Sequence, residues 1–169
     1  MNSVKTIDIE LAIMREFKFT QNIIVPNVTN MMRVVPFETD MLVVTKSGYA
    51  TGFEIKVSKS DLKADLRKKH LARINDPIEG SMWFEKYYGK FKHFYYVVPE
   101  HLLDEAIKIV PQRLGIYYLA DYGYLENYRS RTLFNYKWSE AEMVNLMRLG
   151  TMRIYSLKRS LAKYQGSLQ

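Results

Sequence analysis

Three ionisable side chains lie in a stretch of this sequence that is otherwise strongly apolar. Asp40 directly precedes the apolar run of residues 41–45, and Glu54 and Lys56 lie within a second run, residues 53–57. Both runs are rich in β-branched and aromatic residues, and a Lys-Ser-Gly turn separates them, so the pattern predicts a β-hairpin. A charge in such a strand costs several kcal/mol unless it is paired, hydrogen-bonded or bound to a cation. The three charges therefore need a chemical reason to be there.

The chemistry available to these side chains depends on the register of the hairpin. Residues two apart in a strand share a face, so Glu54 and Lys56 project together. If residues 46–48 form a three-residue loop, the opposed pairs are Thr45 with Tyr49, Asp40 with Glu54, and Glu38 with Lys56. A two-residue loop would turn Asp40 to the opposite face, because a slip of one residue turns every side chain over. Opposed residues have Cβ atoms ~5 Å apart, so the longer loop would bring Asp40 and Glu54 within reach of one divalent ion.

Two carboxylates and a lysine in this arrangement suit metal-assisted hydrolysis of a phosphodiester. A hard cation such as Mg²⁺ removes the repulsion between the acids, neutralises the phosphodiester and lowers the pKa of bound water. The Lys56 ammonium would orient the attacking water and stabilise the charge that develops in the transition state. The alternative is a structural ion pair, Glu54 with Lys56 or Glu38 with Lys56, that supports no catalysis.

Other catalytic motifs fit the sequence less well. The three histidines, His70, His93 and His101, lack the spacing of metal ligands. Residues 48–52 have neither the lysine nor the following helix of a phosphate-binding loop. No nucleophile elbow and no dinucleotide-binding glycine pattern occurs.

Helices and strands are expected to alternate around the hairpin. Helical spacing of apolar residues predicts a helix over residues 6–17, which carries Glu10 at the edge of its buried face. A strand that starts at residue 22 is expected to stop at Pro26. Further strands are expected at residues 93–98, 114–120 and 123–129, and further helices at residues 58–74, 100–110 and from 139 onward. Strand, helix, strand in that order predicts at least one parallel crossover in a mixed α/β fold.

A basic helix is predicted directly after the hairpin. Ser58 followed by Asp61 is a capping-box pattern that opens this helix. The cations expected to grip a nucleic-acid backbone are Lys59, Lys63, Arg67 and Lys69. Such binding would weaken as salt is added. Asp65 and Lys69 are spaced as an i,i+4 pair, so part of this charge is ordinary helix-surface chemistry.

Residues 82–91 interleave aromatic side chains with lysines. Two interpretations stay open for them. The aromatic rings would stack on unpaired bases while the lysines contact phosphates. Alternatively, the segment is a short helix packed on the core.

The C-terminal segment, residues 138–165, is expected to be helical. Ser139 and Glu142 form a second capping-box pattern. Apolar residues then alternate at steps of four and three, with a glycine among them: Met143, Met147, Gly150, Ile154, Leu157, Leu161 and Tyr164. Because Gly150 weakens the middle, the pattern predicts either one helix bent there or two helices. The seam would cover the sheet or join two copies in a homodimer.

Length and composition set the class of protein. The 169 residues suffice for one domain with a substantial core, and a hydrophobic content of 47% excludes a disordered chain. The 25 Lys and Arg against 18 Asp and Glu give a net charge of +7, which suits a polyanion such as DNA. The absence of cysteine fits a reducing compartment. With no signal-peptide pattern and no membrane span, we expect a soluble cytoplasmic protein.

The arrangement resembles the PD-(D/E)XK nuclease superfamily. The resemblance rests on a helix with Glu10, then Asp40, a turn, the strand sequence Glu54-Ile55-Lys56 and a following helix. Within the superfamily, the run EIKVSKSDLKAD at residues 54–65 is similar to the MmcB-like DNA-repair proteins. The resemblance implies a restriction-endonuclease-like core, with a central mixed sheet of about four or five strands flanked by helices and a helical C-terminus.

The resemblance also implies roles for individual residues. Asp40, Glu54 and the Ile55 carbonyl would be metal ligands, Lys56 the catalytic lysine, and Glu10 a helix-borne acid that touches the site. Mg²⁺ would be the cofactor, and Mn²⁺ would substitute for it. Two departures from the family pattern exist. The residue before Asp40 is Thr39 rather than proline, and residues 75–91 look like additional material whose role the family does not supply.

The leading hypothesis is a single-domain, Mg²⁺-dependent DNA nuclease, spanning residues 1–169, that acts in DNA repair, recombination or DNA processing. The alternative is a nuclease-fold protein that binds nucleic acid or a protein partner without catalysis. A third hypothesis is a purely structural homodimer built on the C-terminal seam.

Overall fold

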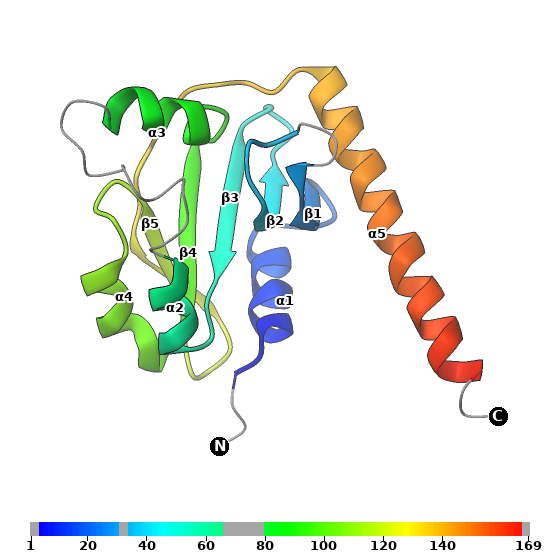
Figure 1. Ribbon diagram of the computed structural model, residues 1–169, viewed down its shortest axis with the longest axis horizontal. Helices are drawn as coiled ribbons and strands as arrows, with labels where there is room; N and C mark the ends of the chain where they lie inside the picture. The colour runs from blue at the N-terminus through cyan, green and yellow to red at the C-terminus, as the bar shows by residue number, and fades with distance from the viewer. Residues whose placement is uncertain (1–3, 31–33, 66–79, 167–169) are drawn as a thin grey trace.

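The computed structural model describes residues 4–30, 34–65 and 80–166. Within these ranges, six strands form one mixed sheet in the order β1-β2-β3-β4-β5-β6 (Figure 1). The strands are β1 (Ile23–Val28), β2 (Thr39–Val44), β3 (Ala50–Ile55), β4 (His93–Pro99), β5 (Gly115–Leu119) and β6 (Leu125–Arg129). The β1, β2 and β3 strands form an antiparallel meander, β3, β4 and β5 are parallel, and β6 returns antiparallel to β5.

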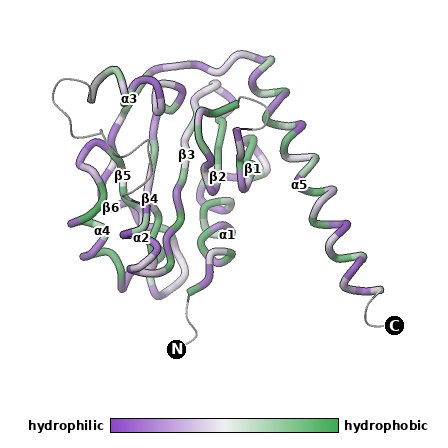
Figure 2. The backbone as a smooth tube through the Cα atoms, viewed as in Figure 1, coloured by the Kyte–Doolittle hydropathy of each residue, from purple (hydrophilic) through white to green (hydrophobic). Residues whose placement is uncertain are grey.

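The helices lie on both faces of the sheet. They are α1 (Thr6–Glu16), α2 (Lys59–Asp65), α3 (Gly80–Tyr88), α4 (Leu103–Ile109) and α5 (Glu140–Gly166). Successive strand residues point to opposite faces, so Met41 and Val43 pack with α1, whereas Leu42 and Val44 pack in the core formed with the other four helices. Figure 2 shows that the helices mix hydrophobic with hydrophilic residues along their length.

The first helix buries only part of its apolar surface. Ile9, Ala12 and Ile13 are buried against the sheet, whereas Ile7 and Leu11 are exposed. Residues at i, i+3 and i+4 share a helix face, and the set that begins at Ile9 is the one that contacts the sheet. This orientation places Glu10 beside the buried side of α1, where it is half-buried.

The hairpin has the register that a three-residue loop requires. The paired residues are Met41 with Phe53, Leu42 with Gly52, Val43 with Thr51 and Val44 with Ala50. The Thr45 N–H donates to the Tyr49 carbonyl at 3.0 Å, and Gly48 takes the left-handed conformation, with φ of 83°, that closes the loop. The predicted hairpin is therefore confirmed, and of the two registers left open the structure has the one with the three-residue loop.

The strand at residues 22–25 continues past Pro26, contrary to expectation. Pro26 pairs with Met41, and β1 runs to Val28. Because β1 is an edge strand, the missing N–H of proline breaks no second ladder. Proline ends a central strand but not an edge strand.

The parallel crossover predicted from strand, helix, strand is present as β4-α4-β5, and β3 is also parallel to β4. The six strands exceed the four or five that the family resemblance implies. The last of them, β6, lies within the strand expected at residues 123–129 and pairs with β5. Gly123, with φ of 87°, and the hydrogen bond from its N–H to the Ala120 carbonyl at 2.8 Å make the turn that allows this pairing.

The aromatic and lysine-rich segment forms α3 and the turn after it. Phe84, Tyr88 and Phe91 are buried in the core, while Lys86 lies over the rings of Trp83 and Tyr87. The interpretation as a helix packed on the core is therefore confirmed for these buried rings.

The C-terminal segment is one helix, α5, without a break at Gly150. Its capping box is formed: the Ser139 N–H donates to Glu142 Oε2 at 2.9 Å, and the Glu142 N–H donates to Ser139 Oγ at 3.3 Å. A Cβ at position 150 would lie 3.3 Å from Val25, so the glycine allows α5 to approach β1. Figure 1 shows the second half of α5 leaving the sheet.

Among the helices of the described ranges, none is both long and apolar enough to cross a membrane.

Candidate active site

Asp40 bridges β2 and β3 through its side chain. The Ile55 N–H donates to Asp40 Oδ2 at 2.6 Å, and the neighbouring Thr39 hydroxyl donates to the Phe53 carbonyl at 2.8 Å. Met41 pairs with Phe53, so the next position along the two antiparallel strands sets Asp40 opposite Glu54. The carboxylate of Asp40 is thus held beside the backbone of the Glu54-Ile55-Lys56 segment.

Glu54 and Lys56 form an ion pair inside the protein. Glu54 is only 2% exposed and Lys56 5%, and Lys56 Nζ lies 2.8 Å from Glu54 Oε1. Both side chains project to the face of the sheet that α2, α3 and α4 cover. Ala50 packs on that face, and Glu54 and Lys56 follow it by four and six residues, so the alternation along the strand puts all three on the same side. Glu38 is exposed, and Lys56 forms its ion pairs with Glu54 and Asp65 rather than with Glu38.

Asp65, expected on the helix surface as a partner of Lys69, is a second acid at Lys56. Its Oδ1 lies 3.5 Å from Lys56 Nζ, and the Tyr96 hydroxyl donates a hydrogen bond to its Oδ2. Asp65 and Tyr96 are each 2% exposed. A signal for Asp65 did exist, because it follows the buried Leu62 by three residues and so shares the inner face of α2. Tyr96 is paired with Glu54 across β3 and β4, which no local pattern reveals.

Burial and crowding set the protonation of these groups. Burial, together with repulsion from Asp40 and Asp65, raises the pKa of Glu54 to about 7, although Lys56 opposes the shift. Burial alone would lower the pKa of Lys56, but its interactions with Glu54, Asp65 and Asp40 raise it above the ordinary value. Lys56 is therefore charged at neutral pH, while Glu54 exchanges a proton there.

Glu10 reaches the same electrostatic neighbourhood from α1. Partial burial raises the pKa of its carboxyl group, and repulsion from Asp40 raises it further. The structure thus brings Asp40, Glu54 and Lys56 together around the Ile55 backbone, while Glu10 interacts electrostatically with Asp40 from α1, which packs on the opposite face of the sheet.

Asp40 and Glu54 offer carboxylate oxygens, which are suitable ligands for a hard divalent cation. Asp40 and Glu54 are carboxylates whose mutual repulsion raises the pKa of Glu54, and a cation would relieve that repulsion. Within residues 4–30, 34–65 and 80–166, no three His, Cys, Asp or Glu side chains are already gathered as a metal site. Mg²⁺ is commonly held by one or two carboxylates, with water and substrate phosphates completing its shell. Two carboxylates are therefore a sufficient protein contribution.

The residues expected to contact nucleic acid are divided between described and undescribed parts of the chain. Lys59 and Lys63 are exposed on α2, but both face Glu105 of α4, at 3.0 Å and 3.7 Å respectively. Arg67 and Lys69 lie outside the described residues, as does the predicted continuation of this helix to residue 74.

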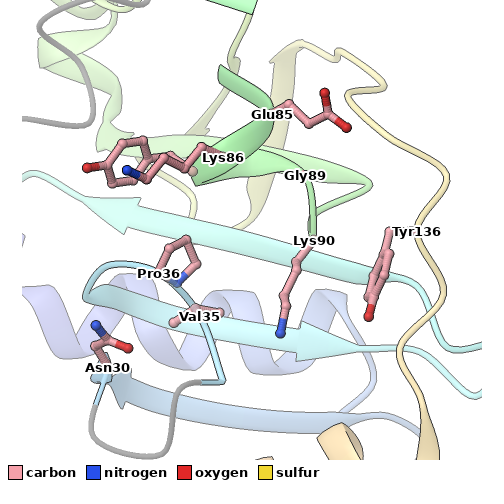
Figure 3. A pocket seen from close by; sticks show the side chains of 9 residues that line it. Asn30, Val35, Pro36, Glu85, Lys86, Gly89, Lys90 and Tyr136 are labelled. Carbon is pink, nitrogen blue, oxygen red and sulfur yellow. The ribbon is translucent and has the colours of Figure 1, made fainter. Parts of the chain in front are cut away.

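A separate pocket of about 410 Å³ lies between α3 and residues 35–36 (Figure 3). Lys90 projects into it but its ammonium contacts Glu142 Oε1 at 2.7 Å and donates to the Val34 carbonyl at 3.2 Å. None of the candidate catalytic residues lines this pocket.

The chain matches no family model and no curated protein. Among solved structures it is similar to the SPO1766 protein of unknown function from Silicibacter pomeroyi, with a TM-score of 0.59 and 16% sequence identity. The match covers 98% of this chain and 97% of that protein. The two proteins therefore share a mixed α/β architecture over nearly their whole length.

Proposed function

We propose that the protein is a divalent-metal-dependent DNA nuclease of the PD-(D/E)XK type, related to the MmcB-like repair proteins. The observation that carries the proposal is the hairpin register. It sets the Asp40 carboxylate against the Ile55 N–H while Glu54 and Lys56 form a buried ion pair on the adjoining strand. Two acids and a lysine from neighbouring strands are the groups that metal-assisted phosphodiester hydrolysis needs.

Lys56 is the proposed catalytic lysine. An ammonium has three N–H donors, and Glu54 and Asp65 face two of them. The remaining donor would hold the attacking water or a phosphate oxygen. Because the two acids are buried, they fix the direction of this donor and preserve the positive charge that opposes the charge developing on the phosphate.

Asp40 and Glu54 are the proposed metal ligands, with the Ile55 carbonyl as the third protein group. When bound, Mg²⁺ or Mn²⁺ would supply Lewis-acid stabilisation of the phosphate and a lower pKa of coordinated water. Asp40 keeps its orientation through the Ile55 N–H, and Glu10 adds negative charge on the Asp40 side.

DNA would lie along α2, next to the candidate active site. The net charge of +7 favours a polyanion, and Lys59 and Lys63 lie on the helix that directly follows the site. We place the backbone contacts on these lysines together with Arg67 and Lys69.

The test is cleavage of plasmid, single-stranded and branched DNA in the presence of Mg²⁺ or Mn²⁺. We expect Asp40→Asn and Lys56→Ala to lower the rate by about a hundredfold or more, because each removes a group that acts on the reacting phosphate. Lys46→Ala, in the exposed hairpin loop, is the matched control and should cleave normally. Thermal unfolding of each variant shows whether the fold is kept.

Calorimetric titration with Mn²⁺ separates this proposal from a nuclease-fold protein that binds DNA without cutting it. Binding that is present in the wild type and lost in Asp40→Asn and Glu54→Gln supports the nuclease. Cleavage that survives both Asp40→Asn and Lys56→Ala in folded protein would sink the assignment. DNA binding without either Mn²⁺ binding or cleavage would replace it by the non-catalytic function.

A further inference from the structure

The C-terminal helix passes from a packed half to an exposed half at one defined point. In its first half, Leu146 and Leu149 are buried and Gly150 lies against Val25 of β1. The Arg153 guanidinium then donates to the Asn27 carbonyl at 2.5 Å. Every residue from 154 to 166 is exposed. The helix therefore runs for roughly 20 Å past Arg153, its last partly buried residue, at ~1.5 Å per residue. Figure 1 shows this end of α5 leading away from the sheet.

The exposed half carries an apolar stripe on the side that continues the packed face. Ile154, Leu157 and Leu161 follow Gly150 at steps of four, three and four, and they are 58%, 61% and 61% exposed. An isolated helix of this length is marginally stable in water. Leaving three large aliphatic residues exposed on it is also unfavourable. Both costs would be removed by a partner that covers the stripe.

The width of the stripe indicates what kind of partner fits. The flanking positions are all polar: Thr151, Lys158 and Gln165 on one side, and Arg153 and Ser160 on the other. The stripe itself occupies two positions in each heptad, which is the narrow seam of a coiled coil. The other apolar residues of this part of the helix, Met152, Tyr155 and Ala162, lie beyond the polar flanking positions. A helix that lies in a membrane surface has a broader apolar face. DNA would contact the cations but leave the stripe uncovered.

The charge of this segment indicates the sign of the partner. No acidic residue follows Glu142, whereas the helix after it carries Arg148, Arg153, Lys158, Arg159 and Lys163. In a seam made by two copies of α5, the flanking residues Arg153 and Lys158 would meet cations in either helix direction. Like charges at these positions are unfavourable, so the pattern disfavours the homodimer and favours an acidic partner.

We propose that residues 154–166 of α5 are a docking segment for an acidic amphipathic helix of another protein. The partner helix would cover Ile154, Leu157 and Leu161 and place carboxylates beside Arg153 and Lys158. The proposal is independent of the nuclease assignment, because it uses none of the residues of the candidate active site.

A designed peptide tests the proposal directly. The probe is a three-heptad helix with leucine at both seam positions and glutamate at both flanking positions, and its counterpart has lysine instead of glutamate. Titrated into the full-length protein, the acidic peptide should bind with micromolar affinity that weakens at least about tenfold at high salt. The lysine peptide should not bind.

Two sets of variants make the test specific. Leu157→Ser combined with Leu161→Ser should weaken binding at least about tenfold. Met152→Ser combined with Tyr155→Ser, which changes exposed residues on the other side of the helix, should leave binding within about twofold. Because all four side chains are exposed, both variants should unfold at the wild-type temperature. Lys158→Glu should weaken the acidic peptide and strengthen the lysine peptide, which a loss of folding would not do.

Three results would overturn the proposal. The first is an acidic peptide that does not bind, or that binds equally well to the stripe variant. The second is stripe-dependent binding to anionic phospholipid vesicles in place of the peptide, which would identify a membrane surface as the partner. The third is dimerisation of the protein in sedimentation experiments that is lost in the stripe variant, which would identify a second copy of this chain as the partner.

Discussion

At the scale of single residues, Lys56 connects acids from two different elements. Glu54 lies on the same strand two residues away, whereas Asp65 comes from α2 and is itself held by the Tyr96 hydroxyl of β4. A buried ammonium is tolerated only when such partners offset its loss of hydration. The proposed catalytic group is therefore oriented by residues that would not touch the DNA.

Removal of this support should affect the chemical step more than DNA binding. In Asp65→Asn and Tyr96→Phe, we expect kcat to fall roughly tenfold to a hundredfold, because the Lys56 ammonium is less well placed, while KM stays within about twofold. Steady-state cleavage of a short oligonucleotide measures both constants. Asp61→Asn, an exposed acid on the same helix, is the control. A raised KM at constant kcat would instead assign Asp65 to DNA binding.

Glu54 should make the stability of the metal-free protein depend on pH. Its pKa is about 7 in the folded chain against an ordinary value of 4.5. Between these values the folded state holds a proton that the unfolded state has released, so the contribution is fully present below the lower value and is lost as pH rises through the higher one. The loss should be on the order of 1–3 kcal/mol.

Urea unfolding with chelator at about pH 5 and about pH 8 measures this loss. Glu54→Gln cannot release the proton, so it should lose less stability than the wild type over the same range. Equal losses in the two proteins would show that other groups govern the pH dependence.

At the scale of elements, the pairing of α2 with α4 limits the charge available for DNA. Lys59 and Lys63 both face Glu105, whose pKa is lowered by its hydrogen bond to Lys59 and by the neighbouring lysines. An acid next to the proposed phosphate-binding lysines competes with phosphate for them. The basic character of this helix is therefore smaller than its sequence suggests.

Glu105→Gln should therefore strengthen DNA binding. We expect the dissociation constant at low salt to fall about twofold to fivefold, since two lysines lose their internal partner. Fluorescence anisotropy with a labelled duplex measures the change. Asp104→Asn alters the net charge equally at an exposed position on the same helix, so an equal gain there would mean that only overall charge matters.

At the scale of the whole molecule, the folded core ends before the chain does. The sheet and the helices on its two faces contain the buried residues, and the last of these in the described ranges is Leu149. The exposed end of α5 contributes no buried apolar side chain to this core.

Removal of residues 154–169 should leave the fold unchanged. We expect the thermal midpoint to shift by less than about 3 °C, because no buried contact is lost, and DNA cleavage to continue. Differential scanning calorimetry checks the first expectation and the plasmid assay the second. A large drop in the midpoint would mean that this segment supports the core after all.

Several features of the fold followed from local sequence patterns. The Lys-Ser-Gly turn between two apolar runs indicated the hairpin, and of the two loop lengths considered the structure has the three-residue loop, which sets Asp40 opposite Glu54. Ser58 and Ser139 marked helix starts because a cap involves residues only three apart: the Asp61 N–H and the Glu142 N–H donate to them.

Features that depend on distant contacts did not follow from such patterns. The exposure of Ile7 and Leu11 on α1 and the extension of β1 through Pro26 were decided by what each segment packs against. Asp65 resembled a surface acid because its partners lie on other elements, and Tyr96 is 31 residues away from it.

The sequence by itself determined the hairpin and the two registers between which its turn left a choice, because strand side chains alternate with period two. The structure has the three-residue loop, which sets Asp40 opposite Glu54. Only the tertiary structure decided how Lys56 is held, which lysines Glu105 engages and where α5 leaves the core. Those outcomes depend on elements far apart in the chain, whose relative positions follow from packing of the whole sheet and not from any local pattern.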